Sequence, residues 1–164
     1  MDFEPETLLL DLQQAIKQRL ISDTWFSGMD VFTPDDFTES GENQAAADLE
    51  QRIEQSLSSL KKGVCILILF PKISGIATDS PGILADNVPL FVRVVENPLV
   101  NRASSGLRKT ASMVMIRVMR RLQHFAYREC VIVLSDSKHV PDETNLIWDV
   151  IGKTAVNFPA LEVT

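Results

Sequence analysis

The sequence predicts an α+β fold, with a mainly antiparallel sheet of about four strands and helices packed on one face of it. Three segments repeat their apolar residues with the 3.6-residue period of a helix, and several shorter segments are apolar runs or alternate like strands. The predicted order is helix, strand, helix, strand, strand, helix, strand, strand. Because two pairs of strands follow one another with no helix between them, we expect antiparallel neighbours.

Two helices and a short strand are predicted in the first 62 residues. The first helix covers residues 5–21, where Pro5 suits the opening turn and the leucines and isoleucine share one face. The second covers residues 44–62 and stops at Gly63. Between them, residues 29–32 are predicted to form a short strand.

Four longer strands are predicted in the rest of the chain. Residues 64–70, VCILILF, are a continuous apolar run, which is typical of a central strand covered on both faces. Residues 88–97 and 130–135 are rich in β-branched side chains. Residues 146–158 alternate apolar and polar side chains, which predicts a long one-sided strand with a kink at Gly152.

The third helix is predicted over residues 107–127. Its core face carries six apolar residues at helical spacing: Ala111, Val114, Met115, Val118, Leu122 and Phe125. Ser104 or Ser105 is predicted to cap this helix, and Gly106 to ease the turn into it.

The whole chain, 1–164, is predicted to be a single α+β domain with mobile loops at 33–43, 71–87 and 136–145. Hydrophobic residues make up 45% and charged residues 23% of the sequence, as in an ordinary soluble globule. A chain of 164 residues can bury a core without help from metals or disulfides.

The two cysteines and the first residues of the sequence indicate the cellular compartment in which the protein is made. Cys65 and Cys130 lie inside apolar runs and are predicted to be buried free thiols in strands. The first residues are acidic and do not resemble a secretory signal, and no apolar stretch approaches the length of a membrane span. We therefore expect synthesis in the cytoplasm and no membrane partner.

Charge is distributed unevenly along the chain, whose net charge is −6. Residues 1–50 hold twelve acids and two bases, a balance of −10, whereas residues 102–128 hold seven bases and no acid, a balance of +7. Two faces of opposite sign suit head-to-tail self-association. The negative total argues against general nucleic-acid binding.

Residues 91–110, FVRVVENPLVNRASSGLRKT, run from a strand through a serine- and glycine-containing loop into a helix, as a phosphate-binding loop does. That loop requires a lysine directly after its second glycine, and a first glycine five positions earlier. Here two residues separate Gly106 from Lys109, and Asn101 occupies the earlier position. The sequence therefore argues against a nucleotide site.

Other catalytic and metal-binding patterns are equally weak. Ser135, Asp136 and His139 contain the residue types of a hydrolytic triad, but three neighbours in one turn-rich segment do not provide its geometry. The spacings typical of metal sites, such as CxxC or HExxH, do not occur in the sequence. The prediction is a protein that is not an enzyme and has no catalytic, cofactor-binding or metal-binding residues.

A basic stripe on the third helix is the most informative feature. Arg117, Arg121, His124 and Arg128 recur at helical spacing, with Arg120 beside them. Three interpretations stay open: a core helix with a solvated basic back, a contact face for an acidic protein surface, and a nucleic-acid ridge. The last is the weakest, because the stripe lacks interleaved aromatic residues.

The order of elements resembles that of the phage tail terminator, or tail-completion, proteins. The similarity is carried by three stretches: GVCILILFPKI, VPLFVRVVENPLVNR and LRKTASMVMIRVMRRLQHF. In organisation the resemblance extends over about residues 5–158. This family has little fixed motif and contributes no catalytic residues to transfer.

The resemblance implies a structural assembly protein of the virion tail, assembled in the bacterial cytoplasm. Several copies, usually six, would form a ring that caps the tail tube and joins it to the head–neck proteins. The alternative from the residues themselves is a small adaptor or regulatory domain that binds an acidic partner through the basic helix 108–128. The predicted interface residues are Arg108, Arg117, Arg120, Arg121, Arg128, Asp35, Asp36 and Glu39.

Overall fold

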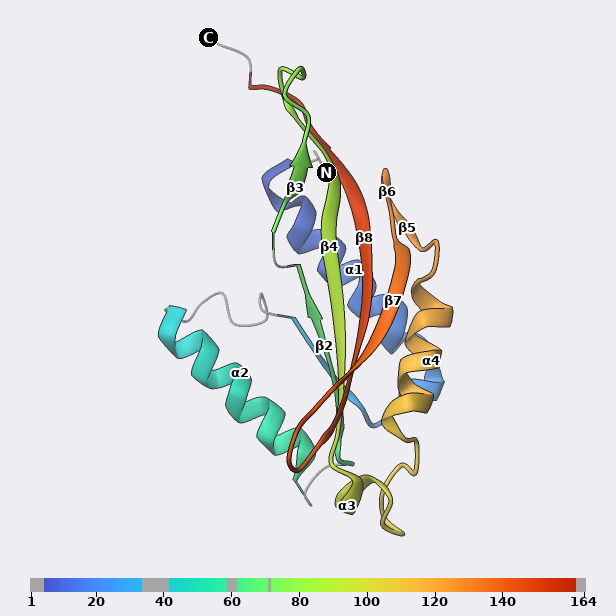
Figure 1. Cartoon of the computed structure of the whole chain (residues 1–164). Coiled ribbons are helices and arrows are strands. Elements are labelled where there is room, and N and C mark those ends of the chain that lie inside the picture. Colours follow the sequence, from blue (N-terminus) through green and yellow to red (C-terminus); the bar gives the residue numbers. More distant parts are fainter. Residues whose placement is uncertain (1–4, 34–41, 59–61, 71, 162–164) are drawn as a thin grey trace.

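A mostly antiparallel sheet forms the centre of the molecule in the computed structural model, which describes residues 5–33, 42–58, 62–70 and 72–161 (Figure 1). Side chains are described for these residues except 42–48. Six of the described strands belong to this sheet, in the order β1-β2-β4-β8-β7 with β3 beside β4. They are β1 Asp30–Phe32, β2 Val64–Leu69, β3 Ser74–Ile76, β4 Ile83–Glu96, β7 Val133–Val140 and β8 Leu146–Phe158. The pairings among these described strands are antiparallel, except that β1 pairs with β2 in parallel.

The mixed helix-and-sheet class and the mostly antiparallel pairing are confirmed, whereas the described sheet has more strands than the predicted four. The bounds of β8 agree with the predicted strand 146–158, and its side chains alternate between buried and exposed along the second half. The predicted irregularity at Gly152 lies in the neighbouring strand. There the register shifts between Leu134 and Asp136 of β7, opposite Gly152 and Ile151.

Four α-helices are described: α1 Leu8–Ile21, α2 Glu42–Leu57, α3 Pro98–Asn101 and α4 Ala111–Leu122. Two short 3-10 helices flank α1, η1 Pro5–Thr7 and η2 Thr24–Phe26. Both α1 and α4 pack on the face of the sheet where alternate side chains of β2 and β4, including Ile66 and Val92, form the larger core. Leu12 of α1 and Val118 of α4 are fully buried there.

The prediction that all helices cover one face is wrong, because α2 packs on the opposite face of the sheet (Figure 1). Leu57 of α2 joins Cys65 and Leu67 of β2 in a second, smaller core, with Leu49 and Ile53 packed against it. The continuous apolar run of β2 explains this arrangement, since both faces of that strand must be covered.

Two of the predicted loops contain strands. The segment 71–87 holds β3 and the first residues of β4, and the segment 136–145 holds the second half of β7. Ser74 pairs with Asn87 and Ile76 with Ala85, so the first segment is largely a hairpin. The third predicted loop, 33–43, lies outside the described residues except for Thr33 and the first residues of α2.

The hairpin lengthens the molecule into an arm. We define the arm as residues 72–88 and 154–161: β3, the first part of β4 and the last part of β8 with the segment after it. The arm extends past the helices at one end of the molecule, where the strands taper together (Figure 1). Residues 91–96 of β4 pair with β2 on one side and with β8 on the other, in the body of the sheet.

The third predicted helix is shorter than expected at both ends. It begins at Ala111, after a cap by Thr110, whose hydroxyl accepts a hydrogen bond from the Met113 N–H (3.4 Å from nitrogen to oxygen). It ends at Leu122, and a small hairpin follows, formed by β5 Ala126–Tyr127 and β6 Cys130–Val131. His124 and Arg128 have positive φ angles of 61° and 53°, so neither belongs to the helix.

Candidate functional site

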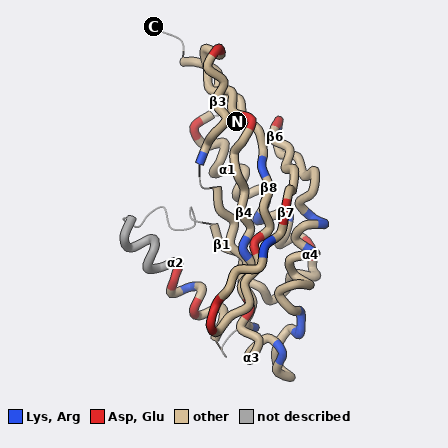
Figure 2. The backbone as a smooth tube through the Cα atoms, viewed as in Figure 1, with Lys and Arg blue, Asp and Glu red and all other residues tan. Residues whose placement is uncertain are grey.

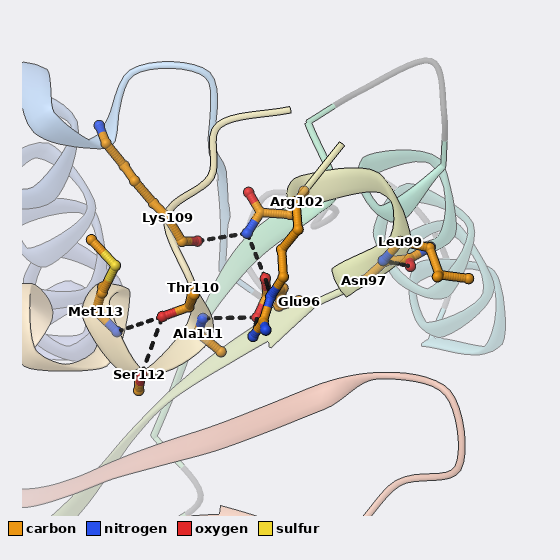
Figure 3. A network of polar contacts seen from close by, with 10 residues as sticks. Glu96, Asn97, Leu99, Arg102, Lys109, Thr110, Ala111, Ser112 and Met113 are labelled. Carbon is orange, nitrogen blue, oxygen red and sulfur yellow. Dashed lines mark hydrogen bonds and ion pairs between the residues drawn. The ribbon is translucent and has the colours of Figure 1, made fainter. Parts of the chain in front are cut away.

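The loop that resembles a phosphate-binding loop is folded around the chain's own carboxylate. Glu96, at the end of β4, is fully buried, and three groups of the 97–111 segment donate hydrogen bonds to it (Figure 3). Its oxygens accept from the backbone N–H of Ala111 at 3.0 Å, the Asn101 side-chain amide at 2.5 Å, and Arg102 Nε and Nη2 at 3.2 and 3.3 Å. A negative charge is favourable at the first N–H groups of α4. Glu96 thus occupies the position at which this helix would bind an external anion.

The charge of Glu96 is stabilised despite its burial. Burial alone would raise the pKa of this carboxyl group, but the hydrogen bonds from Arg102, Asn101 and the Ala111 N–H outweigh that effect and lower the pKa from 4.5. Gly106 permits the tight loop, because a Cβ at this position would overlap the carbonyl oxygen of Asn101. The loop is therefore a joint that fixes the start of α4.

A second buried carboxylate connects α1 to the side of α4. Asp23 follows α1 and accepts hydrogen bonds from Arg117 (Nε 2.8 Å, Nη2 3.1 Å), from Arg121 (Nε 2.7 Å) and from the backbone N–H of Trp25 (3.1 Å). These two arginines hold the pKa of Asp23 well below its ordinary value of 3.8. The Trp25 ring also faces two cations, with Lys109 Nζ 4.5 Å and the Arg117 guanidinium carbon 5.6 Å from its centroid.

The predicted basic stripe is consequently divided. Arg117 and Arg121 lie on α4 but contact Asp23, and their side chains are 29% and 35% exposed. Arg120 is exposed on the outer side of the same helix. Arg108 lies before the helix with a positive φ of 58°, and Arg128 lies in the β5–β6 turn over the Tyr127 ring.

Lys and Arg positions do cluster along the backbone of α4 and the loop before it, as Figure 2 shows. Of the seven bases in residues 102–128, at least five contact groups within the chain: Arg102, Lys109, Arg117, Arg121 and Arg128. The predicted acidic interface residues, Asp35, Asp36 and Glu39, lie outside the described residues. An interface role for all eight predicted residues stays a prediction.

Exposed apolar side chains form a first candidate contact surface on α4. Met113 and Ile116 are 46% and 53% exposed, and with Arg120 they lie within one narrow sector of the helix, at positions i, i+3 and i+7. We call these three residues the α4 outer patch. Both Met113 and Ile116 therefore lie outside the buried face of α4.

A second candidate surface is a groove between the arm and the first two helices of the chain, η1 and α1. It has a volume of about 560 Å³ and is mostly apolar. Its apolar lining includes Pro5, Leu9, Ile73, Ile83, Phe158 and Leu161. Glu6 also lines it and is exposed. We call this feature the arm groove. The groove is not predicted from the sequence, because residues 71–87 are expected to form a loop, whereas β3 and β4 form a hairpin there.

The residue types of a hydrolytic triad do not face one another as a catalytic unit. The Ser135 hydroxyl donates to the Ile151 carbonyl (3.3 Å), Asp136 accepts from the Ser137 N–H (2.8 Å), and the His139 ring contacts the Trp148 ring edge-on. Across the described residues, no group of three or more His, Cys, Asp or Glu side chains is placed to hold a metal ion.

Cys65 and Cys130 are both buried free thiols, as predicted. Burial raises the pKa of Cys65 to about 12, with a contribution from nearby Asp30. Burial also raises the pKa of Cys130. Neither thiol is therefore activated as a nucleophile at neutral pH.

The chain matches no protein-family model, and no curated protein matches it at a significant level. Among the described helices, none combines the length and the hydropathy required to cross a bilayer.

Proposed function

We propose that the protein is a non-enzymatic structural assembly protein, a phage or prophage tail terminator that forms a ring on the end of the tail tube and joins it to the neck. The observation that carries this proposal is the presence of two exposed, mainly apolar surfaces on different elements, the α4 outer patch and the arm groove. A contact between two different surfaces of one chain is heterologous, and heterologous contacts build rings or filaments.

The fold class and the resemblance in the order of elements support the same proposal. The chain's polar networks also favour a structural role, because Glu96 and Asp23 bind groups of their own chain and fix α4 in place. Tail tube protein and head–neck proteins are the proposed partners, and six copies are the expected number in the ring.

The alternative, an adaptor that binds an acidic protein through the basic helix, has less support. It depends on Arg117, Arg120 and Arg121, and two of these three side chains already contact Asp23. Of these three side chains, Arg120 is the fully exposed one.

Assembly state and partner binding test the proposal. We expect light scattering and negative-stain microscopy of the purified chain to show closed rings whose population grows with concentration. We also expect the ring to stop the polymerisation of its partner tail tube protein. A strict monomer at every concentration and ionic strength would contradict the ring and favour the adaptor.

A further inference from the structure

The α4 outer patch is a rigid, convex surface. α4 is fixed at its first turn by Glu96 and along its side by Asp23, through the contacts described above. Its outward side chains therefore have a defined position relative to the sheet. Two of them, Met113 and Ile116, are apolar and about half exposed, and Arg120 adds one positive charge a turn later.

The arm groove has the opposite properties. It is concave, and apolar side chains from α1, η1 and the arm line it, including Ile83 at 42% exposure and Leu161 at 86%. Glu6 contributes a negative charge to its lining. The arm itself carries Asp79 and Asp86 against one base, Lys72. An apolar convex surface with a cation would fit this groove in both shape and charge.

We propose that the α4 outer patch of one copy of this chain docks in the arm groove of the next copy. Ile116 and Met113 are the apolar anchors, and Arg120 pairs with Glu6 of the neighbour. This inference rests on the proposed ring and adds to it the two surfaces that meet at each subunit boundary. The two surfaces belong to different elements, so each copy can donate its patch in one direction and accept a patch in the other.

Two variants that each remove one surface provide the test. Ile116→Asp places a charge in the α4 outer patch, and Ile83→Asp places one in the arm groove. Ile21→Asp is the matched control, because Ile21 is 49% exposed at the end of α1 and belongs to neither surface. We expect each test variant to weaken self-association by about tenfold or more, as for the loss of a central apolar anchor. The control is expected to assemble like the unchanged chain.

Mixing the two test variants distinguishes a head-to-tail contact from any symmetric one. The Ile83→Asp chain keeps an intact α4 outer patch, and the Ile116→Asp chain keeps an intact arm groove. An equimolar mixture should therefore form one-to-one dimers and stop there, while each variant alone stays monomeric. Sedimentation velocity of the two variants, separate and mixed, measures this directly.

Charge reversal gives a second test at exposed positions, where effects on folding are small. Arg120→Glu and Glu6→Lys should each weaken self-association, and the chain that carries both changes should recover it. Rings that are unaffected by Ile116→Asp or Ile83→Asp, or a mixture that stays monomeric, would overturn the proposed contact while the ring itself stands. A wild-type chain that is monomeric at all concentrations would overturn both.

Discussion

Glu96 and Asp23 are both buried carboxylates that hold α4, but they do so in different ways. Glu96 is fully buried, and its donors come from the segment of 15 residues that follows it in the sequence. The Asp23 side chain is 5% exposed and binds two arginines that lie 94 and 98 residues away. One carboxylate shapes a local loop, and the other joins two helices that are distant in sequence.

The two carboxylates also differ in what happens to their hydrogen-bond donors when the carboxylate is removed. Without Glu96, the Asn101 amide and the Ala111 N–H would lose a buried acceptor. Without Asp23, the two arginines could turn toward solvent, since each is already about one-third exposed. Buried groups that lose a partner cost more than exposed ones. Glu96 should therefore be the more important of the two for stability.

The largest effect is expected from Glu96→Gln. The neutral side chain keeps the shape but presents an N–H group to donors, so the free energy of unfolding should fall by about 3 kcal/mol. Urea denaturation at pH 7 measures this loss. Asp149→Asn is a suitable control, because this carboxylate pairs with Arg93, whose side chain is 40% exposed. A loss no greater than that of the control would contradict the structural importance of the Glu96 network.

Asp23→Asn should destabilise the protein less than Glu96→Gln. The asparagine oxygen can still cap η2 by accepting from the Trp25 N–H, while the two charged hydrogen bonds from Arg117 and Arg121 are weakened. The same urea experiment compares the two variants. A double-mutant cycle with Arg117→Ala should show coupling between Asp23 and Arg117. Independent, additive effects would show that the ion pair adds nothing to stability.

Stability should also fall in acid, and the two carboxylates should contribute to that fall. The folded protein lowers the pKa of Asp23 from 3.8 and of Glu96 from 4.5, so the unfolded chain takes up these protons first as the pH falls. The stabilisation is fully present above these ordinary values and is lost progressively below about pH 4.5. Urea midpoints measured from pH 6 to pH 2 should decline less steeply for Asp23→Asn than for the unchanged chain. If the urea midpoints of the two proteins declined in parallel, that result would contradict the lowered pKa of Asp23 in the folded protein.

The smallest effect concerns the cap of α4, where sequence and structure disagree. Thr110→Ala should cost about 1 kcal/mol, because it removes the side-chain oxygen that accepts from the Met113 N–H. Ser104→Ala, at the position predicted from the sequence, should change stability by less than about 0.5 kcal/mol, since that residue is exposed in the loop. Thermal unfolding of the two variants side by side measures this contrast. A larger loss of stability for Ser104→Ala than for Thr110→Ala would show that Ser104 caps the helix, as the sequence predicts.

The elements that could be predicted are those whose sequence pattern reflects their immediate surroundings. β8 alternates because one face is buried, and β2 is apolar throughout because α2 and α1 cover its two faces. The start of α4 could not be predicted, because Ser104 is as good a potential cap as Thr110 until Glu96 fixes the loop. The pairing of Arg117 with Asp23 could not be predicted either. The two residues are distant in the sequence, and only the packing of α1 on α4 brings them together.

β4 is the strand on which the sheet depends, because it pairs with β2 on one side and with β8 on the other. During synthesis, a ribosome must release nearly all of the described chain before β8 can form its long ladder with β4. Until then, the β8 part of the arm and the β8 part of the sheet against which α4 packs stay unassembled. Late pairing between distant segments is slow and exposes apolar surface to other chains. We therefore expect a nascent chain that stalls before residue 146 to be captured by chaperones or to aggregate.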